Sequence, residues 1–159
     1  MNLTRLRSIL EQEADQADRS KSSLLEKLHE FFQEEHHADP QLGRIMEMLK
    51  ARDQLPVAFS RFDIQDLPRR VCLMSWKEKA SVVQSIESIV EECTTVSGGD
   101  CDECMGDELI YMWDLQCGRL VKCCLLCSDA LDLAGTKVAG PLKLIDATEL
   151  QLRAARIIC

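Results

Sequence analysis

Residues 101–135 read CDECMGDELIYMWDLQCGRLVKCCLLCSDALDLAG. This stretch contains two Cys-x-x-Cys pairs, Cys101/Cys104 and Cys124/Cys127, separated by a segment that alternates like two strands around a glycine turn. Each pair offers two thiolates from one tight turn, and a hairpin between the turns brings four sulfurs together. The spacing therefore predicts a four-thiolate metal site.

The segment between and after the pairs has a definite expected order. Glu108 to Asp114 alternates as a strand, Cys117-Gly118 turns the chain, and Leu120 to Cys123 returns as a second strand. Cys124 to Ala134 is typical of a helix with Gly135 at its C-terminal cap. Cys124 and Cys127 would then lie in its first turn, where the helix dipole favours thiolates.

The order of a Cys-x-x-Cys turn (a zinc knuckle), a hairpin and a helix resembles that of the treble-clef zinc finger. The C-x2-C-x19-C-x2-C spacing is similar to that of its GATA-type members. The resemblance covers residues 101–135 and implies structural Zn²⁺ bound by both cysteine pairs. GATA-type fingers that read DNA carry basic residues, whereas Cys101 to Ala134 contains seven acidic residues against only Arg119 and Lys122. Phosphate contacts need clustered Lys and Arg, so we expect no direct binding of nucleic acid.

The cysteines allow other interpretations. The four could be buried free thiols or could hold iron in a rubredoxin-like site. Cys123 competes with Cys124 as a ligand, although only Cys124 keeps the Cys-x-x-Cys spacing. Cys117 is either a redox partner of Cys123 or Cys124 or an ordinary turn residue. We expect the remaining three to be small buried hydrophobes: Cys72, Cys93 and Cys159.

Length and composition predict a folded acidic protein. The chain has 159 residues, 46% of them hydrophobic, and a formal net charge of −8. It has no long uncharged apolar run, and its first residues, MNLTRLRSILEQEAD, lack the apolar core and cleavage site of a signal peptide. We therefore expect no membrane association and a cytoplasmic location, where the nine cysteines stay reduced or bind metal.

Residues 1–97 carry a helical pattern. We expect helices from about Asn2 to Ala17, from Ser23 to His37, from Leu42 to Leu49, a short one from Asp66, and a long one opened by a Ser75/Glu78 capping box and ended by Ser97-Gly98-Gly99. In the first helix Leu3, Leu6, Leu10, Ala14 and Ala17 form the apolar stripe, with Glu11, Glu13, Asp15 and Asp18 outside it.

A change in composition at about residue 97 predicts two subdomains, 1–97 and 98–159. The second continues past the cysteine module with strands at residues 136–138 and 142–145 and a final helix. Asp146 and Glu149 are spaced as its capping box, and Leu150, Ala154 and Ile157 as its apolar stripe. The predicted class is α+β and mostly α: a helical bundle, a small treble-clef zinc module and a C-terminal strand and helix segment.

The sequence gives little indication of catalysis. His36-His37 after Glu34-Glu35 has the residue types of a metal or acid/base site, but the spacing fits a polar helix end better. The chain contains no glycine-rich phosphate loop and no nucleophile elbow. Four cysteine ligands also close the tetrahedron that a catalytic zinc leaves open. We therefore expect a protein that is not an enzyme.

The functional hypothesis is stoichiometric binding of a basic protein. In size, acidity and expected compartment the chain is similar to bacterial toxin-immunity proteins, which implies an inhibitor of a basic nuclease toxin. Alternatives are a zinc-finger regulator associated with the transcription or translation machinery and a zinc-thiolate redox sensor. Trp113 is a candidate anchor, although it could instead pack over the zinc site. The candidate partner-binding residues are Asp102, Glu103, Asp107, Glu108, Asp114 and Trp113.

Overall fold

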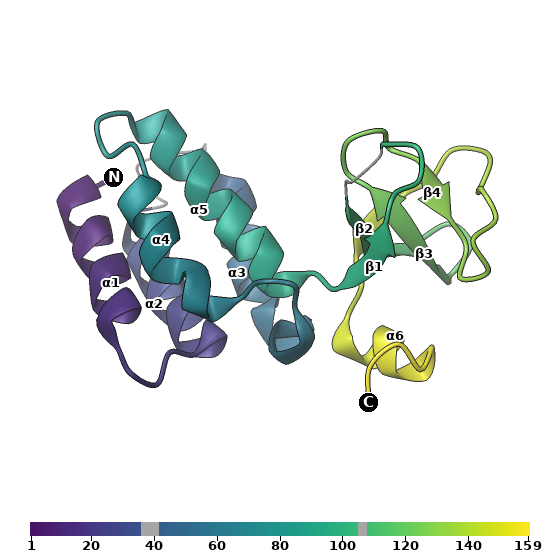
Figure 1. The fold of residues 1–159 in the computed structure, drawn as a ribbon, viewed down its shortest axis with the longest axis horizontal. Helices are drawn as coiled ribbons and strands as arrows, with labels where there is room; N and C mark the ends of the chain where they lie inside the picture. Colours follow the sequence, from purple (N-terminus) through teal and green to yellow (C-terminus); the bar gives the residue numbers. More distant parts are fainter. Residues whose placement is uncertain (36–41, 105–107) are drawn as a thin grey trace. The chain divides into compact units, whose positions relative to one another are not determined.

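The chain forms two compact units in a computed structural model that describes residues 1–35, 42–104 and 108–159 (Figure 1). The first unit comprises Met1–Asp53 and Phe62–Cys93, and the second comprises Gln54–Arg61 and Thr94–Cys159. Helices make up the first unit and a small antiparallel sheet the second. The α+β class is therefore confirmed, whereas the division into subdomains 1–97 and 98–159 stays a prediction.

The first unit is a helical bundle whose leucines recur every three or four residues. Its helices are α1 (Leu3–Asp15), α2 (Lys21–Glu35), α3 (Gly43–Ala51), α4 (Leu67–Leu73) and α5 (Lys79–Thr94), with short 3-10 turns at Arg52–Gln54 and Ile64–Asp66. That periodicity places one stripe of each helix in the core. The core includes Leu6, Leu10, Leu24, Leu25, Leu28, Phe31, Phe32, Leu42, Ile45, Leu49, Leu67, Val82 and Ile86.

Two residues of the predicted first helix depart from the expected pattern. Glu13 was expected to face solvent, but it is 1% exposed. It forms an ion pair with Lys27 and accepts a 2.7 Å hydrogen bond from Gln16 Nε2, and these contacts offset the cost of burying the charge. Ala17, expected in the stripe, lies beyond the helix end and is exposed.

The helix ends follow local chemistry. Asn2 caps α1 by accepting a 3.1 Å hydrogen bond from Arg5 N, and Pro68 occupies the first turn of α4, where no amide donor is needed. The long helix α5 begins at Lys79, later than a Ser75/Glu78 capping box requires. The predicted end of the second helix at His36-His37 lies outside the described residues.

The second unit is built around a β-hairpin. Its strands are β1 (Ser97–Asp100), β2 (Glu108–Asp114), β3 (Arg119–Cys124), β4 (Ala130–Leu131) and β5 (Leu144–Asp146). The path is β1-β2-β3-β4, and β5 pairs with β2 along Met112–Asp114, beyond the residues of β2 that pair with β1. The predicted hairpin is confirmed, with Gly118 in the left-handed region at φ +62°. Ser97-Gly98-Gly99, expected only to end a helix, forms β1 instead.

The helix predicted from Cys124 to Ala134 is wrong, and with it the treble-clef order. Cys124 is the last residue of β3, and the chain then turns into β4. The turn closes through hydrogen bonds from Ser128 N to Cys124 O and from Cys124 N to Asp129 O, at 3.0 and 2.9 Å. Ser128 has a left-handed φ of 61°, which interrupts a helix. Val138 N then donates to Ala130 O, so this segment extends the sheet.

The last helix, α6 (Glu149–Ala154), begins later than predicted because Asp146 still belongs to β5. Its capping box joins Thr148 and Gln151. Leu152, 1% exposed, is its core residue, whereas the predicted Leu150 is 78% exposed. The core beneath α6 contains Val96, Leu120, Ala147 and Leu152, with Trp113, Tyr111 and Ile157 packed against it.

Within the described residues, no helix has both the length and the apolar character needed to cross a membrane.

Candidate metal centre

The four predicted ligand sulfurs gather at one end of the sheet. The Sγ atoms of Cys101, Cys104, Cys124 and Cys127 all lie within 4.8 Å of one another. The Cys101–Cys127 sulfur distance is 3.8 Å and the Cys104–Cys124 distance is 3.7 Å. A tetrahedral site with Zn–S bonds of about 2.3 Å places its sulfurs about 3.8 Å apart, whereas a disulfide needs about 2.05 Å. The arrangement fits a tetrahedral metal ion and is far too open for disulfides.

The hairpin explains why the two pairs meet. Cys101 directly follows β1, which pairs with the start of β2, and Cys124 lies opposite Leu109 in the β2–β3 ladder. Both turns therefore close over the same end of β2. Leu109 and the two buried thiols, Cys101 and Cys124, form the small core there, and Cys104 and Leu131 pack against it.

Hydrogen bonds favour a thiolate at Cys124. The backbone N–H groups of Cys127 and Leu126 donate toward this sulfur and, against the effect of burial, lower its pKa to about 7. The pKa of Cys104 is raised, first by its hydrogen bond with Cys127 and then by burial. A thiolate at Cys124 is therefore favoured, whereas Cys104 would need a nearby cation to release its proton.

Exposure differs across the four cysteines. Cys101 is 4% exposed and Cys124 is fully buried, whereas Cys104 is half-buried and Cys127 lies at the surface. A metal ion bound here would be enclosed on the sheet side and closest to solvent at Cys127.

Cys123 and Cys117 lie away from the sulfur cluster. Cys123 precedes Cys124 on β3, and neighbouring residues of a strand point to opposite faces. Cys117 is exposed in the turn at the opposite end of the hairpin. The ladder from Arg119 to Cys124 is roughly 17 Å long at ~3.3 Å per residue. The pairing of Cys117 with Cys123 or Cys124 considered from the sequence is therefore contradicted by the hairpin geometry.

The other three cysteines divide by burial. Cys93 is buried as predicted, and desolvation raises the pKa of its thiol to about 12. Cys72 and Cys159, expected to be buried, are both exposed.

The predicted partner-binding residues fall into different environments. Asp102 and Glu103 are exposed between the first two cysteines, whereas Asp107 lies outside the described residues. Glu108 is half-buried and accepts a 2.9 Å hydrogen bond from Arg61 Nη1. Of the predicted acidic residues that the structure describes, Asp102 and Glu103 are therefore the exposed ones beside the sulfur cluster.

Trp113 and Asp114 make their contacts inside the second unit. Trp113 is half-buried and packs on the core beneath α6, so it packs as the alternative interpretation expected but over a different core from the metal centre. Asp114 has no exposed surface, and its Oδ1 accepts a 3.0 Å hydrogen bond from Gln116 N. Its Oδ2 lies 3.6 Å from Arg119 Nε. This placement removes Asp114 from any contact surface.

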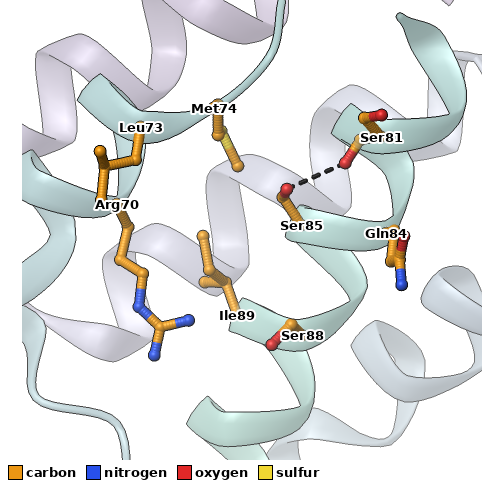
Figure 2. A pocket seen from close by; sticks show the side chains of 8 residues that line it. All are labelled: Arg70, Leu73, Met74, Ser81, Gln84, Ser85, Ser88 and Ile89. Carbon is orange, nitrogen blue, oxygen red and sulfur yellow. Dashed lines mark hydrogen bonds between the residues drawn. The ribbon is translucent and has the colours of Figure 1, made fainter.

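Among the surface hollows formed by the described residues, two of similar size lie in the first unit. One, of about 400 Å³, lies between α4 and α5 (Figure 2). Ser85 Oγ donates to Ser81 O at 2.9 Å, and Arg70 Nη2 lies 2.6 Å from Glu92 Oε2, so these polar groups already have partners within the unit. The other, of about 390 Å³, lies along α1 and α4 and includes Trp76 and Glu11. The described residues that line the first hollow include three serines and no histidine or carboxylate, whereas the lining of the second includes Cys72, Glu11 and Asp15.

Sequence reasoning missed Leu125 and Leu126 as surface residues. They lie between the second pair of cysteines and are 53% and 72% exposed. Their assignment to a helix concealed them, and the turn geometry around Ser128 left no clear signal in the residue types.

Comparison with known proteins adds no relative: no family model, no curated protein and no solved structure matches the chain. The sulfur geometry and the distribution of charge therefore carry the functional argument.

Proposed function

We propose that the chain binds one Zn²⁺ ion through Cys101, Cys104, Cys124 and Cys127 and acts as an acidic protein-binding module without catalytic activity. The observation that carries the proposal is the sulfur geometry, with two sulfur–sulfur distances of 3.8 and 3.7 Å at the open end of the β2–β3 hairpin. Four thiolates fill a tetrahedral zinc ion and leave no open position for substrate, as in structural sites. The metal would hold the two turns against β2.

The binding partner we propose is a basic protein, and the class of activity is that of an immunity protein that neutralises a basic nuclease toxin. The support is electrostatic. The chain has a net charge of −8, and four thiolates around Zn²⁺ would add a formal −2 at one end of the second unit. A strongly negative surface steers basic partners toward it and repels nucleic acid. The proposed compartment is the cytoplasm, where thiols stay reduced.

The exposure of Cys127 favours a second candidate, a zinc-thiolate redox sensor. Oxidation of a surface ligand would break the four-sulfur set and release the metal. Mild peroxide should then release zinc from the wild-type protein. A Cys117 variant should release zinc at the same peroxide dose. Retention of zinc under these conditions would exclude this candidate.

The test of the main proposal is native mass spectrometry of the protein purified gently from its own cells at natural abundance. One spectrum reports both metal and retained partner. We expect one zinc ion per chain and a 1:1 complex with a basic protein. A chain without metal would refute the zinc site, and a zinc-bearing chain that keeps no partner at low salt would refute the binding function.

A further inference from the structure

The turn between the second pair of cysteines presents two adjacent leucines to solvent. Leu125 is 53% exposed and Leu126 is 72% exposed. Single exposed leucines are ordinary on protein surfaces, but two neighbours on a tight turn form a continuous apolar tip.

The turn is held by several hydrogen bonds. The N–H groups of Leu126 and Cys127 point to the Cys124 sulfur, and Ser128 N donates to Cys124 O at 3.0 Å. The leucines are therefore fixed outside the sulfur cluster by the same turn that positions the ligands. A preorganised apolar tip loses little conformational entropy on binding.

Exposed acidic residues lie on the turn next to this tip. The 3.8 Å contact between the Cys101 and Cys127 sulfurs brings the first turn, with exposed Asp102 and Glu103, beside the second. Lys137 is the only basic residue in residues 97–104 and 124–137, and it is ion-paired with Asp129 at 2.7 Å. The acidic residues of these two segments are Asp100, Asp102, Glu103, Asp129 and Asp132.

We propose that Leu125, Leu126, Asp102 and Glu103, here called the metal-site tip, form the docking surface for a protein that presents an apolar hollow ringed by Lys and Arg. This inference rests on the binding function proposed above and names its surface. An apolar centre with a charged rim is the usual arrangement of an interface hot spot. The acidic rim disfavours nucleic acid and anionic lipid as occupants, because both carry negative charge.

The metal-site tip differs from the contact set expected from sequence. Trp113 packs on the core beneath α6 and Asp114 is fully buried, so neither belongs to the proposed docking surface. Leu125 and Leu126 take the place of Trp113 as the apolar centre of that surface. Only Asp102 and Glu103 belong to both sets.

The experiment begins with photo-crosslinking in the source cells. Benzoylphenylalanine replaces Leu126 in one chain and Leu150 in a control chain, since Leu150 is 78% exposed on α6 of the same unit. The crosslinked protein is identified, purified and titrated against the zinc-loaded full chain. We expect crosslinking from position 126, none from position 150, and a basic partner that binds 1:1.

Variants of the full chain then test the surface. Leu125→Ser/Leu126→Ser should weaken binding of the purified partner by roughly tenfold or more, because the apolar centre is lost. Asp102→Lys/Glu103→Lys should slow association and flatten its salt dependence. Glu26→Lys/Glu30→Lys is the matched control: it makes the same change in net charge at exposed positions of the first unit and should have a much smaller effect.

The outcomes separate the surface from the function. Each variant must first bind one zinc ion and keep the wild-type circular dichroism spectrum, which establishes that the fold is intact. A partner that binds the Leu125→Ser/Leu126→Ser variant with wild-type affinity would overturn the metal-site tip and leave the binding function standing. Absence of a crosslinked protein from both positions, together with a partner-free native mass spectrum, would overturn the binding function itself.

Discussion

Replacement of Cys101 by serine should unfold the cysteine module while leaving the first unit folded. Cys101 is 4% exposed and its sulfur lies 3.8 Å from that of Cys127. Serine removes one thiolate from the proposed zinc site and places a hydroxyl in a buried position. Both changes act on the same end of the sheet.

The structure explains the size of the effect. The small core beside the sulfur cluster contains Cys101, Leu109 and Cys124, with Cys104 and Leu131 packed against it, so most of its members are proposed ligands. Zinc binding supplies on the order of 10 kcal/mol of folding free energy in small thiolate modules. A whole domain is stable by only about 5–15 kcal/mol. The folding free energy lost with the metal is therefore larger than the few apolar contacts at this end of the sheet can provide.

The assay combines metal analysis with amide NMR spectra. The wild-type chain should contain one zinc ion, and the Cys101→Ser chain should contain almost none. Amide signals of residues 97–136 should lose their dispersion, while the helical circular dichroism of α1 to α5 should largely persist. A zinc chelator added to the wild-type chain should produce the same spectrum.

Cys117→Ser is the matched control, since this thiol is exposed in the turn at the far end of the hairpin. It should keep zinc and all signals. A wild-type chain that is metal-free yet shows a dispersed β2–β3 spectrum, indifferent to chelator and to Cys101→Ser, would refute the reasoning.

Three further substitutions have distinct expected outcomes. Burial alone would raise the pKa of Glu108, but hydrogen bonds from Ser97 and Arg61 and the Arg61 charge lower it. The ionised Glu108 therefore stabilises the fold above the unfolded pKa of about 4.3, and this stabilisation is lost as the pH falls through the lower folded pKa. Because this side chain is 35% exposed, Glu108→Gln should cost only about 0.5–1 kcal/mol at pH 7, and urea titrations should show the difference from wild type shrinking below pH ~4. Phe32→Ala should lower the unfolding free energy of the first unit by about 3–5 kcal/mol, because Phe32 is fully buried and its ring centroid lies 5.1 Å from that of Phe31 in an edge-on contact. Helical circular dichroism during denaturation measures the change. A loss under about 1 kcal/mol would contradict the assignment of Phe32 to the core. Gly118→Ala should cost about 1 kcal/mol of stability from the φ of +62° alone, since a Cβ there meets no atom within 4 Å. Thermal melting of the zinc-loaded protein measures this loss. An equal or higher melting temperature would disprove the backbone strain.

The helices could be predicted because their signals are periodic. Leu6, Leu10 and Ala14 repeat along α1, and the leucine and phenylalanine pairs of α2 lie on its buried side. Glu13 broke the pattern because its charge is compensated by Lys27 on another helix, and this tertiary contact is invisible in a local pattern. Cys72 was missed for the related reason that apolar neighbours in sequence need not surround a residue in space.

The clustering of the four cysteine sulfurs could be predicted from the sequence, but the backbone after Cys124 could not. The hairpin between the pairs carries alternation and a glycine turn, and both signals are local. Residues 124–135 have a helical composition, yet hydrogen bonds to the Cys124 sulfur and the left-handed Ser128 fix a turn there. The geometry of a sulfur site overrides helix propensity, which amounts to only a few tenths of a kcal/mol per residue.

The assignment of Gln54–Arg61 to the second unit means that a boundary in space is not a single boundary in sequence. A fragment starting at residue 98 would lack Arg61, whose side chain bonds both Thr95 and Glu108. Arg61 N also donates to Thr95 O at 2.9 Å, so the two ends of the segment between them lie side by side. A short linker in place of residues 62–93 would therefore yield a continuous gene for the second unit, with residues 54–61 retained as its first segment.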